Sequence, residues 1–182
     1  KDHGGRRFYG KVNIHSRIRD YTLTITQDFS EIRPLLTQER AFYAVDRNVF
    51  GLYGDLFGCV PEDRLLLLDA REEEKTIETA LKICEQMTKI DAKRNARLVS
   101  FGGGITQDIT GLAANLLYRG IHWTFVPTTL LAACDSCIGG KTSVNYRGYK
   151  NLLGTFYPPA EIHICPLFFH TLSEADFLSG LG

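Results

Sequence analysis

Short apolar runs alternate with amphipathic helical patterns along most of the 182-residue chain, and this alternation limits its fold more than any other feature. The runs have the length and apolar character of buried or half-buried strands. They are Tyr21–Thr26, Ala41–Asp46, Arg64–Asp69, Arg97–Phe101, His122–Pro127 and Glu161–Cys165. Two longer segments, Thr76–Asp91 and Asp108–Tyr118, repeat apolar residues at helical spacing. The pattern predicts an α/β fold with a mainly parallel sheet and helices on its faces.

Polar residues and glycines follow several of these predicted strands. In an open parallel sheet, ligands bind beyond the carboxyl ends of the strands. The residues expected along that edge are Asp46, Asp69, the glycines at 102–104 and the threonines at 128–129. We therefore expect a ligand site there. Further along the chain, a capping-box pattern at Ser173–Asp176 predicts the start of a final helix.

The composition excludes several classes of protein. The 21 Lys and Arg residues balance the 21 Asp and Glu residues, so no basic field attracts nucleic acid. No apolar run approaches the length of a membrane span, and no signal peptide opens the chain. Five cysteines, an odd number, suit a reducing, cytoplasmic compartment. Because Met87 is the only methionine and the last residues stop inside a helical pattern, we expect a fragment or excised domain.

The segment GGGITQD at 102–108 has the composition of a phosphate-binding turn. Glycines let the backbone approach a phosphate, and a following helix presents free N–H groups and the positive end of its dipole. The dinucleotide pattern GxGxxG fails, because its third glycine would stand where this chain has Gln107. Asp108, at the expected start of the helix, also fits a tight turn with a capping aspartate. From these residues alone, both interpretations stay open.

A second glycine-containing segment, GGKTS at 139–143, is not a P-loop. That motif needs a glycine at position 135, and the Asp135 found there would repel phosphates. What remains is an acid, two glycines and Lys141, followed by Lys150 and Asn151. Lysines bind carboxylate or phosphate groups, and Asp and Asn side chains bind hydroxyls. The cluster therefore suits a small polyhydroxy anion, although each lysine alone is typical of a solvated surface.

Other chemically suggestive segments have simpler explanations. Cys134 and Cys137 form one CxxC pair, which without a second pair indicates small buried cysteines more than a zinc site. The charge run at 69–76 is typical of a solvated helix start, and Arg119 suits the negative end of a helix dipole. The histidines show no metal-binding spacing. Those interpreted as structural or surface residues are His15, His122, His163 and His170.

Four ordered segments together resemble the 3-dehydroquinate synthase family and its sugar-phosphate cyclase relatives. They are GGGITQDITGLAANLLYRG, VPTTLLAACDSCIGGKTSVN, KNLLGTFYPP and TLSEADFLSGLG. The similarity runs almost unbroken from Phe101 to Gly182, and continues more weakly through Asp46 and the ExxK of Glu72 and Lys75. Four motifs in matching order and spacing are far more specific than any one of them.

The resemblance implies that residues 1–182 form an N-terminal, Rossmann-like NAD-binding domain, with helices on both faces of a mainly parallel sheet. It implies that the chain ends where a helical metal-binding domain begins. Residues that match cofactor contacts of the family are Asp46, Glu72, Lys75, Gly103, Gly104, Ile105, Asp108, Thr128, Thr129, Leu131, Asp135, Ser136, Lys141, Lys150, Phe168 and Thr171. Residues that match its catalytic and substrate-binding positions are Asp135, Lys141, Lys150, Asn151 and Arg119.

The reaction implied by the resemblance converts 3-deoxy-arabino-heptulosonate 7-phosphate to 3-dehydroquinate and phosphate, with transient reduction of NAD, in the shikimate pathway of aromatic amino-acid biosynthesis. The family also uses a divalent metal, zinc or cobalt. Its ligands, a glutamate and two histidines, would lie beyond Gly182, so this chain is assigned no metal ligand and is expected to be inactive alone. Arg119 matches an arginine that reaches the substrate phosphate of the neighbouring subunit, which implies a homodimer.

Two alternatives remain. Ser143 and the pair Tyr146–Arg147 depart from the glycine and His-Pro usual in 3-dehydroquinate synthases. A relative of 2-epi-5-epi-valiolone or 2-deoxy-scyllo-inosose synthase type, which acts on another sugar phosphate, is therefore a second hypothesis. A group III metal-dependent alcohol dehydrogenase is a third. The segments 135–141 and 150–151 argue against it, because a simple alcohol needs no cationic pocket.

Overall fold

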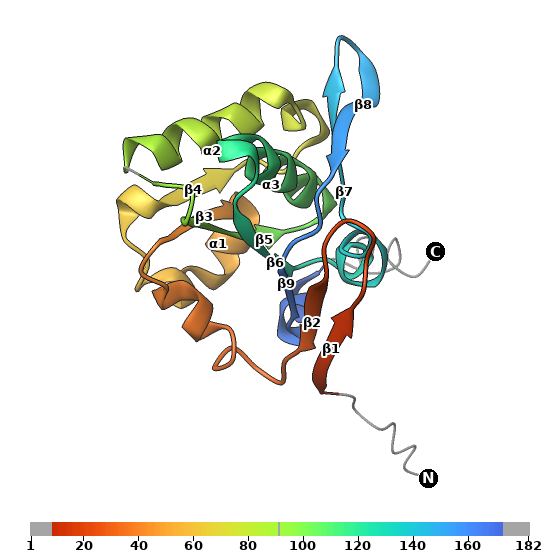
Figure 1. Ribbon diagram of the computed structural model, residues 1–182. Coiled ribbons are helices and arrows are strands. Elements are labelled where there is room, and N and C mark those ends of the chain that lie inside the picture. The colour runs from red at the N-terminus through yellow and green to blue at the C-terminus, as the bar shows by residue number, and fades with distance from the viewer. Residues whose placement is uncertain (1–8, 91, 173–182) are drawn as a thin grey trace.

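The computed structural model describes residues 9–90 and 92–172, which form a seven-stranded sheet with helices on both faces and a separate β-hairpin (Figure 1). The sheet order is β1-β2-β9-β6-β5-β3-β4. Its strands are β1 Gly10–Ile14, β2 Tyr21–Ile25, β3 Ala41–Asp46, β4 Leu65–Leu68, β5 Arg97–Gly102, β6 His122–Pro127 and β9 Glu161–Ile164. Neighbouring strands are parallel except the antiparallel pair β1–β2. The predicted mainly parallel α/β fold is confirmed, whereas the helix predicted from Ser173 lies outside the described residues.

The helices of the described residues are short. The α-helices are α1 Arg47–Tyr53, α2 Ile77–Lys89 and α3 Gly104–Leu116. The 3-10 helices are Arg33–Thr37, Gly54–Phe57, Glu62–Arg64, Glu72–Glu74, Leu117–Arg119 and Pro166–Thr171, and a π-helical turn spans Ala132–Ser136. None of the helices that the structure describes is long and apolar enough to cross a membrane.

The alternation of side chains along β3 explains why both faces of the sheet are covered. Phe42 and Ala44 belong to one hydrophobic cluster, while Tyr43 and Val45 belong to another on the opposite face. The first cluster contains the apolar sides of α2 and α3, which lie together in Figure 1. The second contains α1 and several 3-10 helices. Every residue of β3 is buried, as expected for a strand covered on both sides.

The two predicted helices are present, but the second begins earlier than expected. The segment predicted at 76–91 is α2, with Thr76 as its N-cap residue. The helix α3 begins at Gly104, whereas the apolar pattern predicts a start at Asp108. Gly103 occupies the N-cap, so the glycine turn leads directly into the helix. Asp108 therefore lies in the second turn, and its interpretation as a capping aspartate is wrong.

The segment after Gly140 forms a β-hairpin that the sequence patterns did not predict. Strands β7 Lys141–Tyr146 and β8 Tyr149–Phe156 pair antiparallel, and β7 lies beside α3 (Figure 1). Arg147 and Gly148 form the turn with φ values of 48° and 83°, as a tight two-residue hairpin turn requires. Gly140 has φ 65°, and a Cβ there would lie 2.4 Å from a backbone nitrogen. Because Lys141 opens a strand and no helix, the segment is not a P-loop, as predicted.

Candidate functional site

The turn between β5 and α3 lies at the carboxyl edge of the sheet, where the sequence predicts a ligand site. A Cβ at Gly102 would lie 2.5 Å from the Oγ1 atom of Thr106, in the first turn of α3. A Cβ at Gly103 would lie 3.1 Å from the Cγ2 atom of Thr129, which follows β6. Close packing at these two positions therefore favours glycine, and it brings the turns after β5 and β6 together.

The start of α3 offers both room and hydrogen-bond donors to an anion. A Cβ at Gly104 would meet only the Ser136 Oγ atom, at 3.6 Å, so packing of the described residues does not require this glycine. The first N–H groups of a helix have no acceptor inside it, and the first helical bond here runs from Gln107 N to Gly103 O. The Thr106 hydroxyl is buried without a hydrogen-bond partner among the described residues. Because that hydroxyl is covered by the Gly102 turn, the fit to a phosphate or pyrophosphate comes from the free N–H groups and the space at Gly104.

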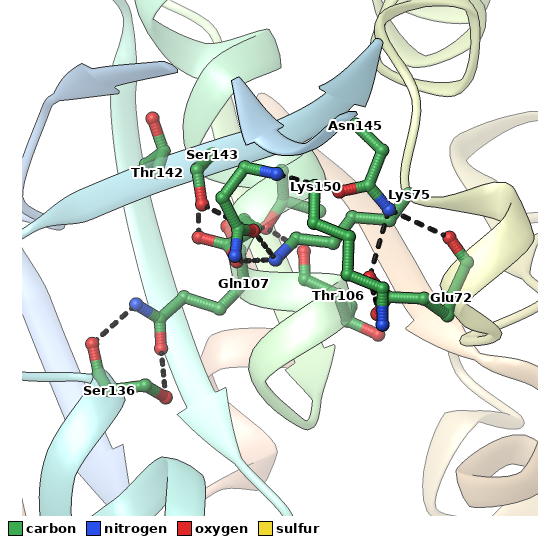
Figure 2. A network of polar contacts seen from close by, with 12 residues as sticks. Glu72, Lys75, Thr106, Gln107, Ser136, Thr142, Ser143, Asn145 and Lys150 are labelled. Carbon is green, nitrogen blue, oxygen red and sulfur yellow. Dashed lines mark hydrogen bonds and ion pairs between the residues drawn. The ribbon is translucent and has the colours of Figure 1, made fainter. Parts of the chain in front are cut away.

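A buried ion pair joins the loop before α2 to the second turn of α3. The Lys75 Nζ atom lies 2.6 Å from the Asp108 Oδ2 atom, and the two side chains are only 10% and 17% exposed. The same ammonium donates to the Asn151 Oδ1 atom at 2.7 Å, and the Ser143 N–H donates to the Asp108 Oδ1 atom at 3.0 Å. Asp108 and Lys75 therefore hold the hairpin against the helical layer. Figure 2 shows Lys75 and Ser143 within this network.

The charge of Asp108 depends on Lys75. Burial is the largest influence, and it raises the pKa of the Asp108 carboxyl above its ordinary value of 3.8. The hydrogen bond and positive charge of Lys75 lower the pKa, as does the Ser143 N–H, while the nearby Glu72 adds to the rise. The ammonium thus favours the carboxylate form at a position where burial alone favours the neutral acid.

Glu72 joins the same network through the hairpin. The Asn145 Nδ2 atom donates to the Glu72 Oε1 atom at 2.9 Å and to the Glu72 carbonyl oxygen at 3.2 Å. The Lys150 Nζ atom lies 4.0 Å from that Oε1 atom, and its side chain is 76% exposed. Five residues singled out from the sequence therefore converge on one polar network: Glu72, Lys75, Asp108, Lys150 and Asn151. Figure 2 labels Glu72, Lys75 and Lys150 of this set.

Gln107, which stands in place of the third glycine of the dinucleotide pattern, has a structural partner. Its Nε2 atom donates to the Ser136 carbonyl oxygen at 2.6 Å, and the Ser136 hydroxyl donates to its Oε1 atom at 3.0 Å (Figure 2). The glutamine is almost fully buried. It therefore ties α3 to the π-helical turn that carries Asp135 and Ser136.

Five further predicted residues lie on segments next to this edge of the sheet. Thr128 is buried, and its N–H donates to the carbonyl at the end of β5. The Thr129 hydroxyl accepts a hydrogen bond from the start of the π-helical turn. Leu131 is 47% exposed, Asp135 is exposed in that turn, and Lys141 is exposed as the first residue of β7. The exposed side chains are accessible to a ligand, and their roles stay predictions.

The remaining predicted residues lie apart from the network. Asp46 ends β3 and caps α1 by accepting a hydrogen bond from the second residue of that helix. Phe168 is 1% exposed within an aromatic cluster, so the structure places it in the core and its predicted cofactor contact stays a prediction. Thr171 bonds to a tyrosine hydroxyl of α1, and Ile105 packs partly into the core. Arg119 is exposed after α3, at the opposite edge of the sheet.

Three polar residues of the site were missed by sequence reasoning. Ser143 and Asn145 belong to the unpredicted hairpin, and their partners lie far away in the sequence. Thr106 was passed over because the helix was expected to begin after it. The segment VPTTLLAACDSCIGGKTSVN contains Ser143 and Asn145, and its resemblance to the family is the one signal that could have found them.

The cysteine pair differs from its expected burial. Cys137 is buried, and burial raises the pKa of its thiol to about 12. Cys134 is exposed, so the prediction that both are buried is wrong for this residue, because the π-helical turn directs it to the surface. Neither forms a disulfide. Within residues 9–90 and 92–172, no group of three or more His, Cys, Asp or Glu side chains is placed to hold a metal ion.

Comparison with known proteins places the chain in one sequence family. The family model for the N-terminal part of 3-dehydroquinate synthase matches residues 65–179. A 3-dehydroquinate synthase from Streptococcus equi subsp. equi is 33% identical over 178 residues, which cover 94% of this chain and 49% of that protein. The chain thus spans about half the length of such relatives.

Two solved structures share its fold over nearly its whole length. A 2-epi-5-epi-valiolone synthase from Streptomyces hygroscopicus subsp. jinggangensis, with NAD+ and Zn2+ bound, is 31% identical with a TM-score of 0.78, and the match covers 93% of this chain and 49% of that one. A 2-deoxy-scyllo-inosose synthase, complexed with carbaglucose-6-phosphate, NAD+ and Co2+, is 25% identical with a TM-score of 0.82, covering 94% and 49%. The Rossmann-like fold predicted from the resemblance is confirmed.

Proposed function

The chain belongs to the 3-dehydroquinate synthase family, and from that premise we propose that it is the NAD-binding half of a 3-dehydroquinate synthase. The whole protein converts 3-deoxy-arabino-heptulosonate 7-phosphate to 3-dehydroquinate and phosphate. NAD supplies a hydride acceptor and later a hydride donor, so it is regenerated in each cycle. In the whole protein a zinc or cobalt ion would complete the site.

The glycine turn at the start of α3 is the observation that carries this proposal. Its free N–H groups and the open position at Gly104 fit a pyrophosphate. Glu72 and Lys75, from the segment before α2, lie near Asp108 in the second turn of α3, where carboxylate and ammonium groups suit ribose hydroxyls. The support therefore comes from the free N–H groups of the glycine turn next to a polar network.

The hairpin and the π-helical turn before it supply the groups that we assign to the substrate. Lys141 and Lys150 are exposed lysines on β7 and β8, and each binds a carboxylate or phosphate oxygen as a point charge. Asn151 and Asp135 provide polar oxygens for ring hydroxyls. These side chains bind and orient a polyhydroxy anion next to the cofactor.

Arg119 supports a homodimer. It lies at the opposite edge of the sheet from the network, so it cannot serve the site of its own chain. Tyr118, Arg119 and Gly120 have consecutive positive φ values of 52°, 63° and 114°. Two non-glycine residues in this conformation cost about 1–2 kcal/mol each, and such strain is typical of functional positions. We assign Arg119 to the substrate phosphate of the neighbouring subunit.

An assay of the full-length protein tests the proposal. The protein is incubated with NAD, a divalent metal and 3-deoxy-arabino-heptulosonate 7-phosphate, and the release of phosphate and of dehydroquinate is measured. We expect both products in equal amounts, without net accumulation of NADH. Net NADH formation from a simple alcohol would instead indicate an alcohol dehydrogenase.

A cyclase with another substrate is the second candidate, because the two solved relatives are named as synthases of other products and Ser143 departs from the usual glycine. In the structure, the Ser143 hydroxyl donates to the Asn151 Oδ1 atom at 3.0 Å, so this departure touches a residue assigned to the substrate. Turnover of sedoheptulose 7-phosphate or glucose 6-phosphate, with no turnover of the seven-carbon keto acid, would favour this candidate.

A further inference from the structure

The hairpin contains an irregularity beside the polar network. The pairs Val144–Leu153 and Tyr146–Tyr149 flank it, so one residue of β7, Asn145, faces three residues of β8. In the middle of these three, Asn151 has φ 54°, a left-handed conformation that asparagine tolerates better than most residues. Bulges of this kind are common beside active sites, where they redirect a side chain.

Asn145 uses its whole amide group on protein partners. Its Nδ2 atom donates to the Oε1 atom and to the carbonyl oxygen of Glu72, at 2.9 Å and 3.2 Å. Its Oδ1 atom accepts the Asn151 N–H at 2.8 Å. Its own N–H donates to the Lys75 carbonyl oxygen at 2.8 Å. One side chain therefore links the 72–75 loop to the bulge (Figure 2).

The bonds of Asn145 determine where two assigned side chains lie. The Asn145 Oδ1 atom accepts the Asn151 N–H, and this bond fixes the left-handed backbone of Asn151. That backbone places the Asn151 Oδ1 atom 2.7 Å from the Lys75 Nζ atom. The Asn145 Nδ2 atom donates to the Glu72 Oε1 atom, and this bond fixes the carboxylate 4.0 Å from the Lys150 Nζ atom. The cofactor side and the substrate side of the network thus share a single support.

We propose that Asn145 is a positioning residue that sets the geometry of Glu72 and Lys75 on the cofactor side and of Asn151 on the substrate side. It touches neither ligand, because its amide is already engaged by protein groups. The proposal rests on the proposed function, since it assigns a role to the support of that site. It predicts that one substitution weakens NAD binding and turnover together.

Two variants of the full-length protein separate the bonds of the Asn145 side chain to Glu72 from its bond to Asn151. Asn145→Ala removes all three side-chain hydrogen bonds, and we expect about a tenfold loss of NAD affinity and at least as large a loss of kcat. Asn145→Asp keeps an acceptor for the Asn151 N–H but places a carboxylate against Glu72. Its NAD affinity should fall at neutral pH, and its kcat with saturating NAD should fall less than that of Asn145→Ala.

A compensating substitution distinguishes positioning from general damage. Glu72→Gln in the Asn145→Asp background lets the introduced glutamine amide donate to the introduced aspartate carboxylate, which reverses the wild-type hydrogen bond. The double variant should therefore bind NAD at least as tightly as Glu72→Gln alone. The matched control is Asn95→Asp, an exposed residue at the opposite edge of the sheet, which should leave NAD affinity and kcat unchanged.

The experiment is calorimetric titration of NAD together with steady-state kinetics for each variant. Wild-type affinity and kcat in both Asn145 variants would overturn the positioning role and leave the proposed function intact. Equal losses in the double variant and in Asn145→Asp would also overturn it. A wild-type protein that neither binds NAD nor releases phosphate would overturn the proposed function and, with it, this inference.

Discussion

The Lys75 ammonium lies 2.6 Å from the Asp108 carboxylate, although the two residues are on different segments and their side chains are only 10% and 17% exposed. The same pair contacts the hairpin through Asn151 and the Ser143 N–H. A single ion pair therefore connects the loop before α2, the helix of the glycine turn and the strands that carry Lys141 and Lys150. The first predictions concern this pair.

Removing Lys75 should destabilise the fold. Lys75→Met leaves the Asp108 carboxylate largely buried without its cation, and we expect a loss of about 3 kcal/mol in the free energy of unfolding. Urea denaturation, followed by circular dichroism, measures this change. Lys89→Met is the matched control, because Lys89 forms an exposed ion pair with Glu85 and should cost less than about 0.5 kcal/mol. Equal losses in the two variants would contradict the structural role of the pair.

The loss in Lys75→Met should depend on pH with a definite sign. The variant removes the hydrogen bond and the charge of Lys75, which lower the Asp108 pKa, while the burial that raises the pKa and the weaker influence of the Ser143 N–H remain. The folded-state pKa then exceeds 3.8, so the folded state binds the proton more tightly than the unfolded chain. This group stabilises the fold below pH 3.8, and the contribution is lost as the pH rises through the raised pKa.

We therefore expect the cost of Lys75→Met to be smallest below pH 3.8 and to grow as the pH rises. The free energy of unfolding, measured in urea between about pH 3 and pH 7, tests this dependence. Adding Asp108→Asn should make the cost nearly independent of pH. A dependence that persists in the double variant would show that another group is responsible.

Gly104→Ala separates packing from cofactor binding. A Cβ at this position meets only the Ser136 Oγ atom at 3.6 Å, and the residue is helical, so the stability should change by less than about 1 kcal/mol. If a pyrophosphate approaches the backbone here, the methyl group should reduce NAD affinity at least about tenfold. Calorimetric titration of NAD measures the effect.

Gly58→Ala is the control for that substitution. Its Cβ would meet only a carbonyl oxygen, at 3.6 Å, in a 3-10 turn away from the network. It should leave NAD affinity unchanged. A Gly104→Ala protein that binds NAD as the wild type does would place the cofactor somewhere other than the start of α3.

Lys141→Ala should affect turnover far more than NAD affinity. Its ammonium is exposed at the start of β7 and is assigned to an anionic group of the substrate. Losing a charged hydrogen bond that strengthens in the transition state should lower kcat/KM about a hundredfold. The control Lys11→Ala changes an exposed lysine of β1 and should alter neither quantity. Equal losses of NAD affinity and turnover in Lys141→Ala would contradict a substrate role.

The central sheet could be predicted from sequence because its strands are buried on both faces. The apolar runs at 41–46 and 122–127 match β3 and β6 residue for residue. The start of α3 was misplaced because Gly103 and Gly104 were interpreted only as a turn. In the structure they are the N-cap and the first residue of the helix, where glycine is compatible with helical backbone.

The hairpin was not predicted because its strands, β8 above all, bury few side chains. Residues of β8 are mostly exposed, and the irregularity at Asn151 breaks the period-two pattern that marks a strand. The resemblance, and not spacing, singled out Glu72, Lys75 and Asn151, but it assigned them to different parts of the site, and their convergence is a finding of the structure. Their support by Asn145 depends on a contact between residues 73 positions apart, which no local pattern contains.

Titration of the chain with NAD, followed by nuclear magnetic resonance of its backbone amides, tests the central claim most directly. We predict that the largest shift changes occur at Gly103, Gly104 and Ile105, with further changes at Lys75 and Asn151. The absence of saturable changes at the start of α3, or changes confined to the opposite edge around Asn95, would contradict the assignment of this turn to the cofactor.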